Sequence, residues 1–149
     1  MATKLTVIAG VTVHAGQQQV WDLVVDWPRQ REWILGTRTE GGHGVGATLV
    51  GRTGIGPIGF ADPMQITEWQ PPTRCAVRHL GTVVRGSGVF EVLPSPRLDG
   101  TEFRWTEQIE LPVPLPPALA RLVSATVVGP AARLGLAWSL RRFARIARS

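Results

Sequence analysis

Apolar and polar residues alternate in the first stretch of the chain, "LTVIAGVTV" at residues 5–13. Every odd-numbered position from Leu5 to Val13 is apolar. Successive side chains of an extended backbone point to opposite faces, so the alternation places these residues on one side. The sequence therefore predicts a strand at 5–13 with one covered face.

Three tryptophans then follow six residues apart in "VWDLVVDWPRQREWI": Trp21, Trp27 and Trp33. In one continuous helix, a step of six residues turns the side chain by about 240°, so the three rings would not share a face. Pro28 also disfavours helix at the residue before it. We therefore expect two short helices, one in "QQQVWDLVVD" and one in "PRQREW", with the rings around the break pressing against one sheet.

The pattern from residue 35 to residue 111 is that of short strands separated by turns. The strand-like stretches are "GATLVGRTG", "FADPMQITEWQ", "TRCAVRHL", "VVRGSGVFEVL" and "TEFRWTEQIEL". A loop "GIGPIG" at 54–59, a hairpin turn at Gly81 and the turn "SPRLDG" at 95–100 connect them. Consecutive hairpins need no crossover helix, so we predict a curved antiparallel sheet of about seven strands.

The last part of the chain is helical. A proline linker, "PVPLPP" at 112–117, precedes it, and Gly129-Pro130 is expected to kink or interrupt the helix. An apolar stripe on the helical wheel consists of Leu136, Leu140, Phe143, Ile146 and Ala147. The predicted class is therefore α+β: a sheet wrapped around a long C-terminal helix, with two short helices after the first strand.

This order of elements resembles the START-like, or SRPBCC, superfamily, specifically its bacterial polyketide cyclase/dehydrase branch. The residues that carry the resemblance are "VWDLVVDWPRQREW", "GVGA", "ITEWQPPTR", "GTEFRWTEQIELP" and "SLRRFARIA", which span most of the chain. The resemblance implies a helix-grip fold with a deep apolar cavity between the sheet and the C-terminal helix. It also implies a cavity arginine and tyrosine in the aromatase/cyclase members. This chain has no tyrosine, which counts against an enzyme.

Composition narrows the classes further. The 149 residues are enough for one domain with a substantial core, so we predict a single domain over 1–149. There is one cysteine, Cys75, no signal-peptide pattern and no run of eighteen apolar residues. We therefore expect a cytoplasmic protein without a membrane span. The histidines lack metal-ligand spacing, and no metal or other cofactor is expected.

The charge is concentrated at the C-terminal end. The net charge is +5, and no Asp or Glu follows Glu110, whereas six arginines do. Such an end suits nucleic acid, anionic lipid or an acidic ligand, or is simply a solvated helix face. Trp138 and Leu134 fall on the side of Arg141 and Arg145, so weak contact with an anionic membrane surface is one hypothesis. We expect no nucleic-acid partner, and either a monomer or a homodimer.

Candidate chemistry follows from the inward parity of three strands. The inward rows are Cys75, Val77 and His79; Gly86, Gly88 and Phe90; and Phe103, Trp105 and Glu107. Hairpin centres near Gly81 and Arg97 make Cys75 face Gly88, and Gly88 face Glu107. The inward glycines leave room for a ligand. In this register His79 lies about four residues along and two strands over from Glu107, too far for a direct hydrogen bond.

Two of these side chains are candidate catalytic groups, each with a structural alternative. Glu107 is a general acid/base or an anchor for a ligand hydroxyl, unless it is a paired core carboxylate or a bulge turns it outward. His79 is a catalytic base, or a residue of the rim or core. The candidate ligand-binding residues are Trp33, Met64, Ile66, Cys75, Val77, Gly86, Gly88, Phe90, Phe103 and Trp105. Of these, Cys75 is most simply a small buried apolar residue.

The sequence thus predicts a protein that binds a small hydrophobic molecule, such as a lipid, isoprenoid, quinone or polyketide. One alternative is a polyketide cyclase or dehydratase that uses Glu107. Another is an accessory protein that contacts a membrane or a partner through the basic C-terminal helix.

Overall fold

The structure, a computed structural model, describes residues 4–82, 84–96, 100–110 and 116–148. Within these ranges the strands are β1 (Lys4–Val13), β2 (Thr37–Gly41), β3 (Thr48–Ile55), β4 (Ile58–Gln70), β5 (Arg74–Leu80), β6 (Arg85–Pro94) and β7 (Thr101–Glu110). The helices are α1 (Gln17–Val24), η1 (Trp27–Glu32), α2 (Pro117–Val123), η2 (Ser124–Val128) and α3 (Gly129–Ala147). Most of the predicted proline linker, 112–115, and the centre of the turn at 97–99 lie outside the described residues.

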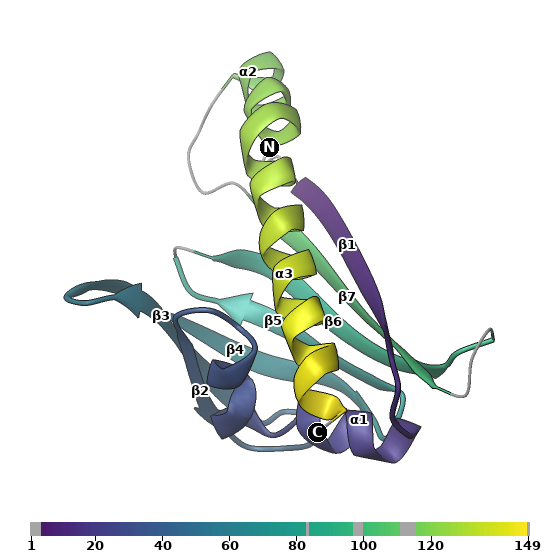
Figure 1. Ribbon diagram of the computed structural model, residues 1–149. Coiled ribbons are helices and arrows are strands. Elements are labelled where there is room, and N and C mark those ends of the chain that lie inside the picture. Colours follow the sequence, from purple (N-terminus) through teal and green to yellow (C-terminus); the bar gives the residue numbers. More distant parts are fainter. Residues whose placement is uncertain (1–3, 83, 97–99, 111–115, 149) are drawn as a thin grey trace.

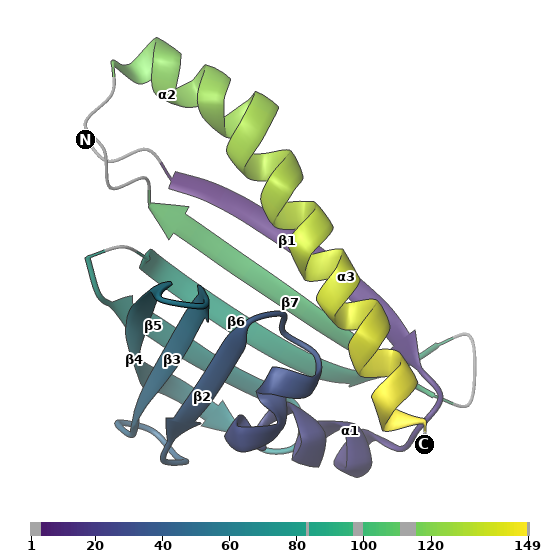
Figure 2. The ribbon, with the colours of Figure 1, turned by 60° about the vertical axis from the view of Figure 1, so that its left-hand side comes forward.

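The strands form one sheet in the order β1-β7-β6-β5-β4-β3-β2, and every pair is antiparallel. The predicted class and sheet are confirmed. Figure 1 shows the sheet curving under the long helix α3, and Figure 2 shows the gap between α3 and the β2–β4 side, where η1 lies. The arrangement is a helix-grip fold.

Two details at the β2–β4 edge differ from the prediction. β2 was not identified from the sequence, because only Thr39 of its five residues is buried and no apolar alternation marks it. The expected loop at 54–59 is much tighter: β3 continues to Ile55 and β4 begins at Ile58, so only Gly56 and Pro57 form the turn. A positive φ of 60° at Gly56 suits the glycine there.

The two short helices are present, and the three tryptophans surround the corner between them. Trp21, Trp27 and Trp33 are all buried. The second helix, η1, is a 3₁₀ helix with Pro28 in its first turn, where the missing N–H of proline has no intrahelical partner to lose. The indole N–H of Trp27 donates to the carbonyl of Gly42 (2.8 Å), which fixes η1 against the chain beyond β2.

Helix α3 covers the β1 side of the sheet and closes the core. Leu140 and Phe143 are fully buried, and the Phe143 ring lies 5.1 Å from that of Trp33. The helix packs mainly on β1. The irregularity expected at Gly129-Pro130 takes the form of a π turn, η2, immediately before it, so residues 117–147 continue as one helix (Figure 1).

By length and composition alone, the helix Pro117–Ala147 is apolar enough to cross a membrane. Only 17% of the most apolar window of this helix is buried. Figure 2 shows the N-terminal end, α2, projecting beyond the end of β1.

Candidate functional site

An enclosed cavity of about 160 Å³ lies between the sheet and the η1 segment. Its walls come from Trp27 and Gln30 of η1, from Ile34, and from inward-facing residues of β2 to β7. Among the described residues that line it, none belongs to α3. The expected position, between the sheet and the C-terminal helix, is therefore wrong: α3 sits on β1, and η1 covers the centre of the sheet.

The structure places most of the predicted site residues in this cavity. Those that line it are Met64, Cys75, Val77, His79, Gly88, Phe90, Trp105 and Glu107. Ile66 and Phe103 are instead fully buried in the core. Gly86 faces an outer groove at the end of β5 and β6. Its φ of 114° is a backbone conformation that favours glycine, so the glycine here is explained by the backbone and not by space for a ligand.

Trp33, a predicted ligand-binding residue, does not line the cavity. It is completely buried, with its ring within 6.0 Å of the rings of Phe90, Phe103, Trp105 and Phe143. Its indole N–H has no hydrogen-bond acceptor within the described residues. Trp33 thus supports the cavity wall through Phe90 and Trp105, because it packs behind both rings.

A chain of four polar side chains forms one wall of the cavity. His79 Nδ1 donates to Asp62 (2.9 Å to Oδ1), and His79 Nε2 donates to Glu107 Oε2 (3.1 Å). The other oxygen of Glu107 accepts a hydrogen bond from Trp105 Nε1 (2.8 Å). The side chains of His79, Asp62 and Glu107 are only 6%, 15% and 13% exposed. They form a nearly buried charged cluster.

The contact between His79 and Glu107 overturns the expectation that they lie too far apart. The last paired residues of β5 and β6 are Leu80 and Arg85. In this register Cys75 faces Phe90 rather than Gly88. The register therefore shifts by two residues from the one expected, which brings His79 closer to Glu107. The predicted pairing of Gly88 with Glu107 is confirmed.

Gly88 makes the contact possible. A Cβ atom at this position would lie 2.7 Å from Glu107 Oε1, closer than real Cβ contacts. The carboxylate of Glu107 therefore lies over the bare backbone of β6 and reaches His79 on β5. The inward glycine thus provides room for a charged contact within the protein.

The electrostatics of the cluster follow from these contacts. Burial lowers the pKa of His79, but the hydrogen bonds to Asp62 and Glu107, together with their charges, outweigh it and raise the pKa to about 9. His79 is therefore an imidazolium at neutral pH, held between two acidic side chains. Burial raises the pKa of the Cys75 thiol to about 12, so Cys75 is not a nucleophile.

Sequence reasoning missed Asp62, although its signal was present. In "FADPMQITEWQ" Asp62 shares the parity of Met64 and Ile66, the same argument that placed Glu107 inside. Trp27 was expected to pack against the sheet, but nothing in the local pattern marked it as a cavity wall. In the part of the chain that the structure describes, no group of His, Cys, Asp and Glu side chains is arranged to hold a metal ion.

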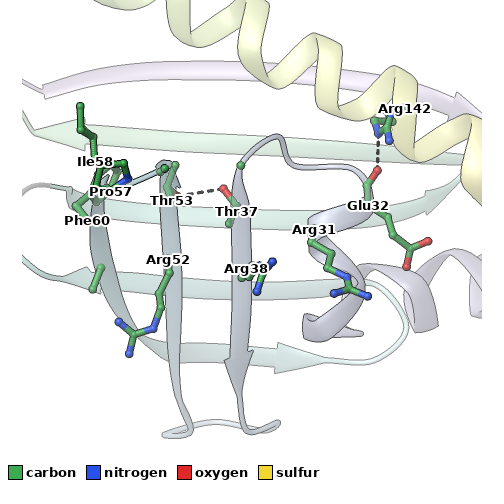
Figure 3. A pocket seen from close by; sticks show the side chains of 15 residues that line it. Arg31, Glu32, Thr37, Arg38, Arg52, Thr53, Pro57, Ile58, Phe60 and Arg142 are labelled. Atoms are coloured by element: carbon green, nitrogen blue, oxygen red, sulfur yellow. Dashed lines mark hydrogen bonds between the residues drawn. The ribbon is translucent and has the colours of Figure 1, made fainter.

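An open groove of about 940 Å³ adjoins the cavity. Thr37 and Thr53 line both, and their hydroxyl groups share a hydrogen bond of 3.0 Å; the dashed line between them in Figure 3 marks it. The groove is bounded by the β3–β4 hairpin, by residues 31–38 and by Arg142 of α3 (Figure 3). Thr37 and Thr53 therefore separate the enclosed space from solvent.

The amino-acid sequence matches the model of a known family. The family model described as "Polyketide cyclase / dehydrase and lipid transport" matches residues 4–148. Among curated proteins, none matches the sequence.

Solved structures share the fold at low sequence identity. The Zhui aromatase/cyclase from Streptomyces sp. R1128 is 18% identical with a TM-score of 0.74, over 98% of this chain and 94% of that one. The protein TTHA0849 from Thermus thermophilus is 16% identical with a TM-score of 0.74, over 96% and 97%. A norcoclaurine synthase point mutant from Thalictrum flavum is 15% identical with a TM-score of 0.62, over 100% and 99%.

Proposed function

Since the chain belongs to the polyketide cyclase/dehydrase and lipid transport family of the START-like superfamily, we propose that it binds a small hydrophobic molecule through the cavity beneath η1. The observation that carries the proposal is the composition of the cavity wall. Apolar side chains such as Leu49, Met64 and Phe90 form most of it, and the cluster around His79 forms one polar edge. Binding sites for small molecules are typically built in this way.

The size of the cavity limits what enters it. An apolar cavity of about 150 Å³ accommodates one benzene molecule, so a space of about 160 Å³ holds about one ring. A quinone, an isoprenoid or a polyketide is larger than this. Such a ligand would place one ring or chain end in the cavity and extend past Thr37 and Thr53 into the open groove.

The charge of the cluster limits the polar group of the ligand. Asp62 and Glu107 carry two negative charges against the one positive charge of His79. A buried net negative charge disfavours an anionic ligand, whereas carboxylate oxygens accept hydrogen bonds from a hydroxyl. We therefore propose a neutral ligand with an O–H donor at the end that enters the cavity.

Three matched fluorescent probes test this preference: 2-naphthol, 2-methylnaphthalene and 2-naphthoate. We expect 2-naphthol to bind most tightly and 2-naphthoate most weakly in a fluorescence titration. Gly88→Phe should abolish binding, because its ring would fill the cavity. Gly135→Phe is the matched control, since Gly135 on α3 has open space around it. Equal probe affinity in a folded Gly88→Phe variant, with folding checked by circular dichroism, would contradict binding at this cavity.

The natural ligand requires a separate measurement. Native mass spectrometry of the purified protein, followed by organic extraction and identification of the bound molecule, would name it. Recovery of an apolar hydroxylated compound from the wild type, and none from Gly88→Phe, is the expected outcome.

Acid–base catalysis is a second candidate function, and the hydrogen bond between His79 and Glu107 is the observation that favours it. In a cyclase reaction the Glu107 carboxylate would remove a proton next to a carbonyl and return it to the alkoxide oxygen formed when a second carbonyl is attacked, while the His79 imidazolium, whose N–H groups both donate within the cluster, would hold Glu107 in place. Incubation with a β-ketoacyl thioester, followed by liquid chromatography and mass spectrometry, tests this role. Product formation that matches the buffer blank, or persists in Glu107→Gln, would exclude it.

A further inference from the structure

The tip of the β3–β4 hairpin carries an exposed apolar patch. Ile55 and Ile58 are 85% and 80% exposed, and Leu35 beside them is 72% exposed. Together with Phe60 they line one hollow at the end of the sheet. Single exposed apolar residues are common on protein surfaces, but a group of this kind at a projecting tip is not. We call Leu35, Ile55, Ile58 and Phe60 the tip patch.

Three arginines line the groove that also contains Ile58 and Phe60 of the tip patch. Arg38 of β2 and Arg52 of β3 are directly paired across the strands, an arrangement in which like charges destabilise a sheet. Arg31 of η1 lines the same groove. Within the described residues none of these three forms an ion pair, and the nearby Glu32 is paired with Arg29. We call Arg31, Arg38 and Arg52 the arginine rim; in Figure 3 Ile58 and Phe60 lie at one side of the groove, followed by Arg52, Arg38 and, farthest from them, Arg31.

We propose that the tip patch and the arginine rim form a docking face for an anionic lipid bilayer. The charge complementarity of the rim selects this partner: three unpaired guanidinium groups match lipid phosphates, to which arginine binds in a planar, bidentate manner. The isoleucines on either side of Gly56-Pro57 then enter the boundary between lipid headgroups and acyl chains, where their side chains are no longer exposed to water. Polyanions without an apolar layer would leave Ile55 and Ile58 in water.

Helix α3 contributes the opposite wall of the groove. Trp138 is 38% exposed, and the guanidinium carbon of Arg142 lies 5.6 Å from the centre of its ring. Arg142 also donates to the backbone carbonyl of Glu32 and lines the groove. The membrane contact expected of the C-terminal helix is therefore assigned to Arg142 and Trp138, because Arg142 lines the groove and contacts the Trp138 ring, and not to Arg145 and Arg148 nearer the end of α3.

The position of the docking face gives it a role. The docking face borders the groove, and the groove shares Thr37 and Thr53 with the cavity. A ligand that leaves a bilayer at this face would therefore enter the groove and pass these two residues to reach the cavity. This role rests on the proposed function, whereas docking itself does not.

Vesicle co-sedimentation tests the docking face. Wild-type protein should bind vesicles of phosphatidylglycerol and phosphatidylcholine, bind pure phosphatidylcholine far more weakly, and dissociate as salt screens the charges. Ile55→Ser/Ile58→Ser and Arg38→Gln/Arg52→Gln should each weaken binding about tenfold or more, because each removes one of the two contributions. Trp138→Ala should weaken it less.

Two matched control variants test whether the loss of vesicle binding is specific to the docking face. Val45→Ser changes another apolar residue, 70% exposed, and Arg145→Gln/Arg148→Gln removes two charges at the end of α3. Both should bind as the wild type does. If the hairpin variant keeps full binding, or if Arg145→Gln/Arg148→Gln loses as much as Arg38→Gln/Arg52→Gln, the docking face is refuted.

A second comparison separates the hairpin from α2, where Leu119 and Leu122 are also exposed. Release by Leu119→Ser/Leu122→Ser, with retention by Ile55→Ser/Ile58→Ser, would move the docking surface to α2 and overturn the proposal. The hairpin variant should keep its affinity for 2-naphthol in solution. Its loss of vesicle binding is therefore distinguishable from a failure of the cavity to bind ligand.

Discussion

At the scale of single residues, His79 is the group whose charge matters most. It lies between Asp62 and Glu107, and both contacts are strongest when its ring carries a proton. Strand parity placed His79 and Glu107 inside the sheet, but their contact depends on a register that parity does not determine. Two predictions follow from this contact: the stability of the protein depends on pH, and Gly88 is needed for Glu107 to reach His79.

The stability of the protein should fall as pH rises from about 6.5 to about 9. The pKa of His79 is raised from 6.5 to about 9 in the folded protein, so the folded state binds more protons than the unfolded state in this window. The stabilisation is complete below the lower value and is lost through the upper one, about 3 kcal/mol in all. Urea denaturation across the window measures it. A His79→Gln variant should show a flatter profile; an equally steep one would contradict the assignment.

Gly88→Ala should lower the pKa of His79. The new methyl group would lie 2.7 Å from Glu107 Oε1, so the carboxylate must move away from the ring. Loss of that bond should also cost about 1–3 kcal/mol of unfolding free energy. Titration of the imidazole signals by NMR measures the first effect. Gly135→Ala, at an open site on α3, should leave the pKa of His79 where it is.

At the scale of the element, α3 has two unlike faces. One packs on β1 and the tryptophan cluster through Leu140 and Phe143, and the other exposes Leu134 and Trp138. The stripe read from the helical wheel predicted the first face correctly. Trp138 lies partly in solvent beside Arg142. This exposure depends on which parts of the protein face that side of α3, and a helical wheel does not contain that information.

Substitutions on the two faces of α3 should therefore differ sharply. Phe143→Ala removes a fully buried ring that contacts Trp33 and Phe103, and should cost about 3–5 kcal/mol. Leu134→Ala removes a side chain that is 69% exposed and should change stability by less than about 0.5 kcal/mol. Chemical denaturation of both variants tests this. Similar losses would mean that α3 does not dock as described.

At the scale of the whole molecule, one core links the short helices, the sheet and α3. Trp33 alone touches rings from β6, β7 and α3. The N-terminal part is further tied to the rest by Gln19, whose amide donates to the carbonyl of Ala147 (3.1 Å). These contacts join the short N-terminal helices, the sheet and α3 within the described part of the chain.

We therefore expect a single cooperative unfolding transition. Tryptophan fluorescence reports on the packing around η1 and Trp105, and far-ultraviolet circular dichroism reports largely on α3 and the sheet. The two transitions should coincide in urea, because neither part has a separate core. If the helix signal is lost at a lower urea concentration than the fluorescence signal, the prediction of one domain fails.

The sequence by itself determined which residues alternate, where the strands and helices other than β2 lie, and which face of those strands is covered. These properties repeat every two or three to four residues, so local pattern contains them. Tertiary structure decided the rest. The connection between Leu80 and Arg85 set the register that joins His79 to Glu107, and shifting it by two residues changes neighbours without changing faces. The placement of η1 over the sheet decided where the cavity lies, because contacts distant in sequence, and no local periodicity, hold it there.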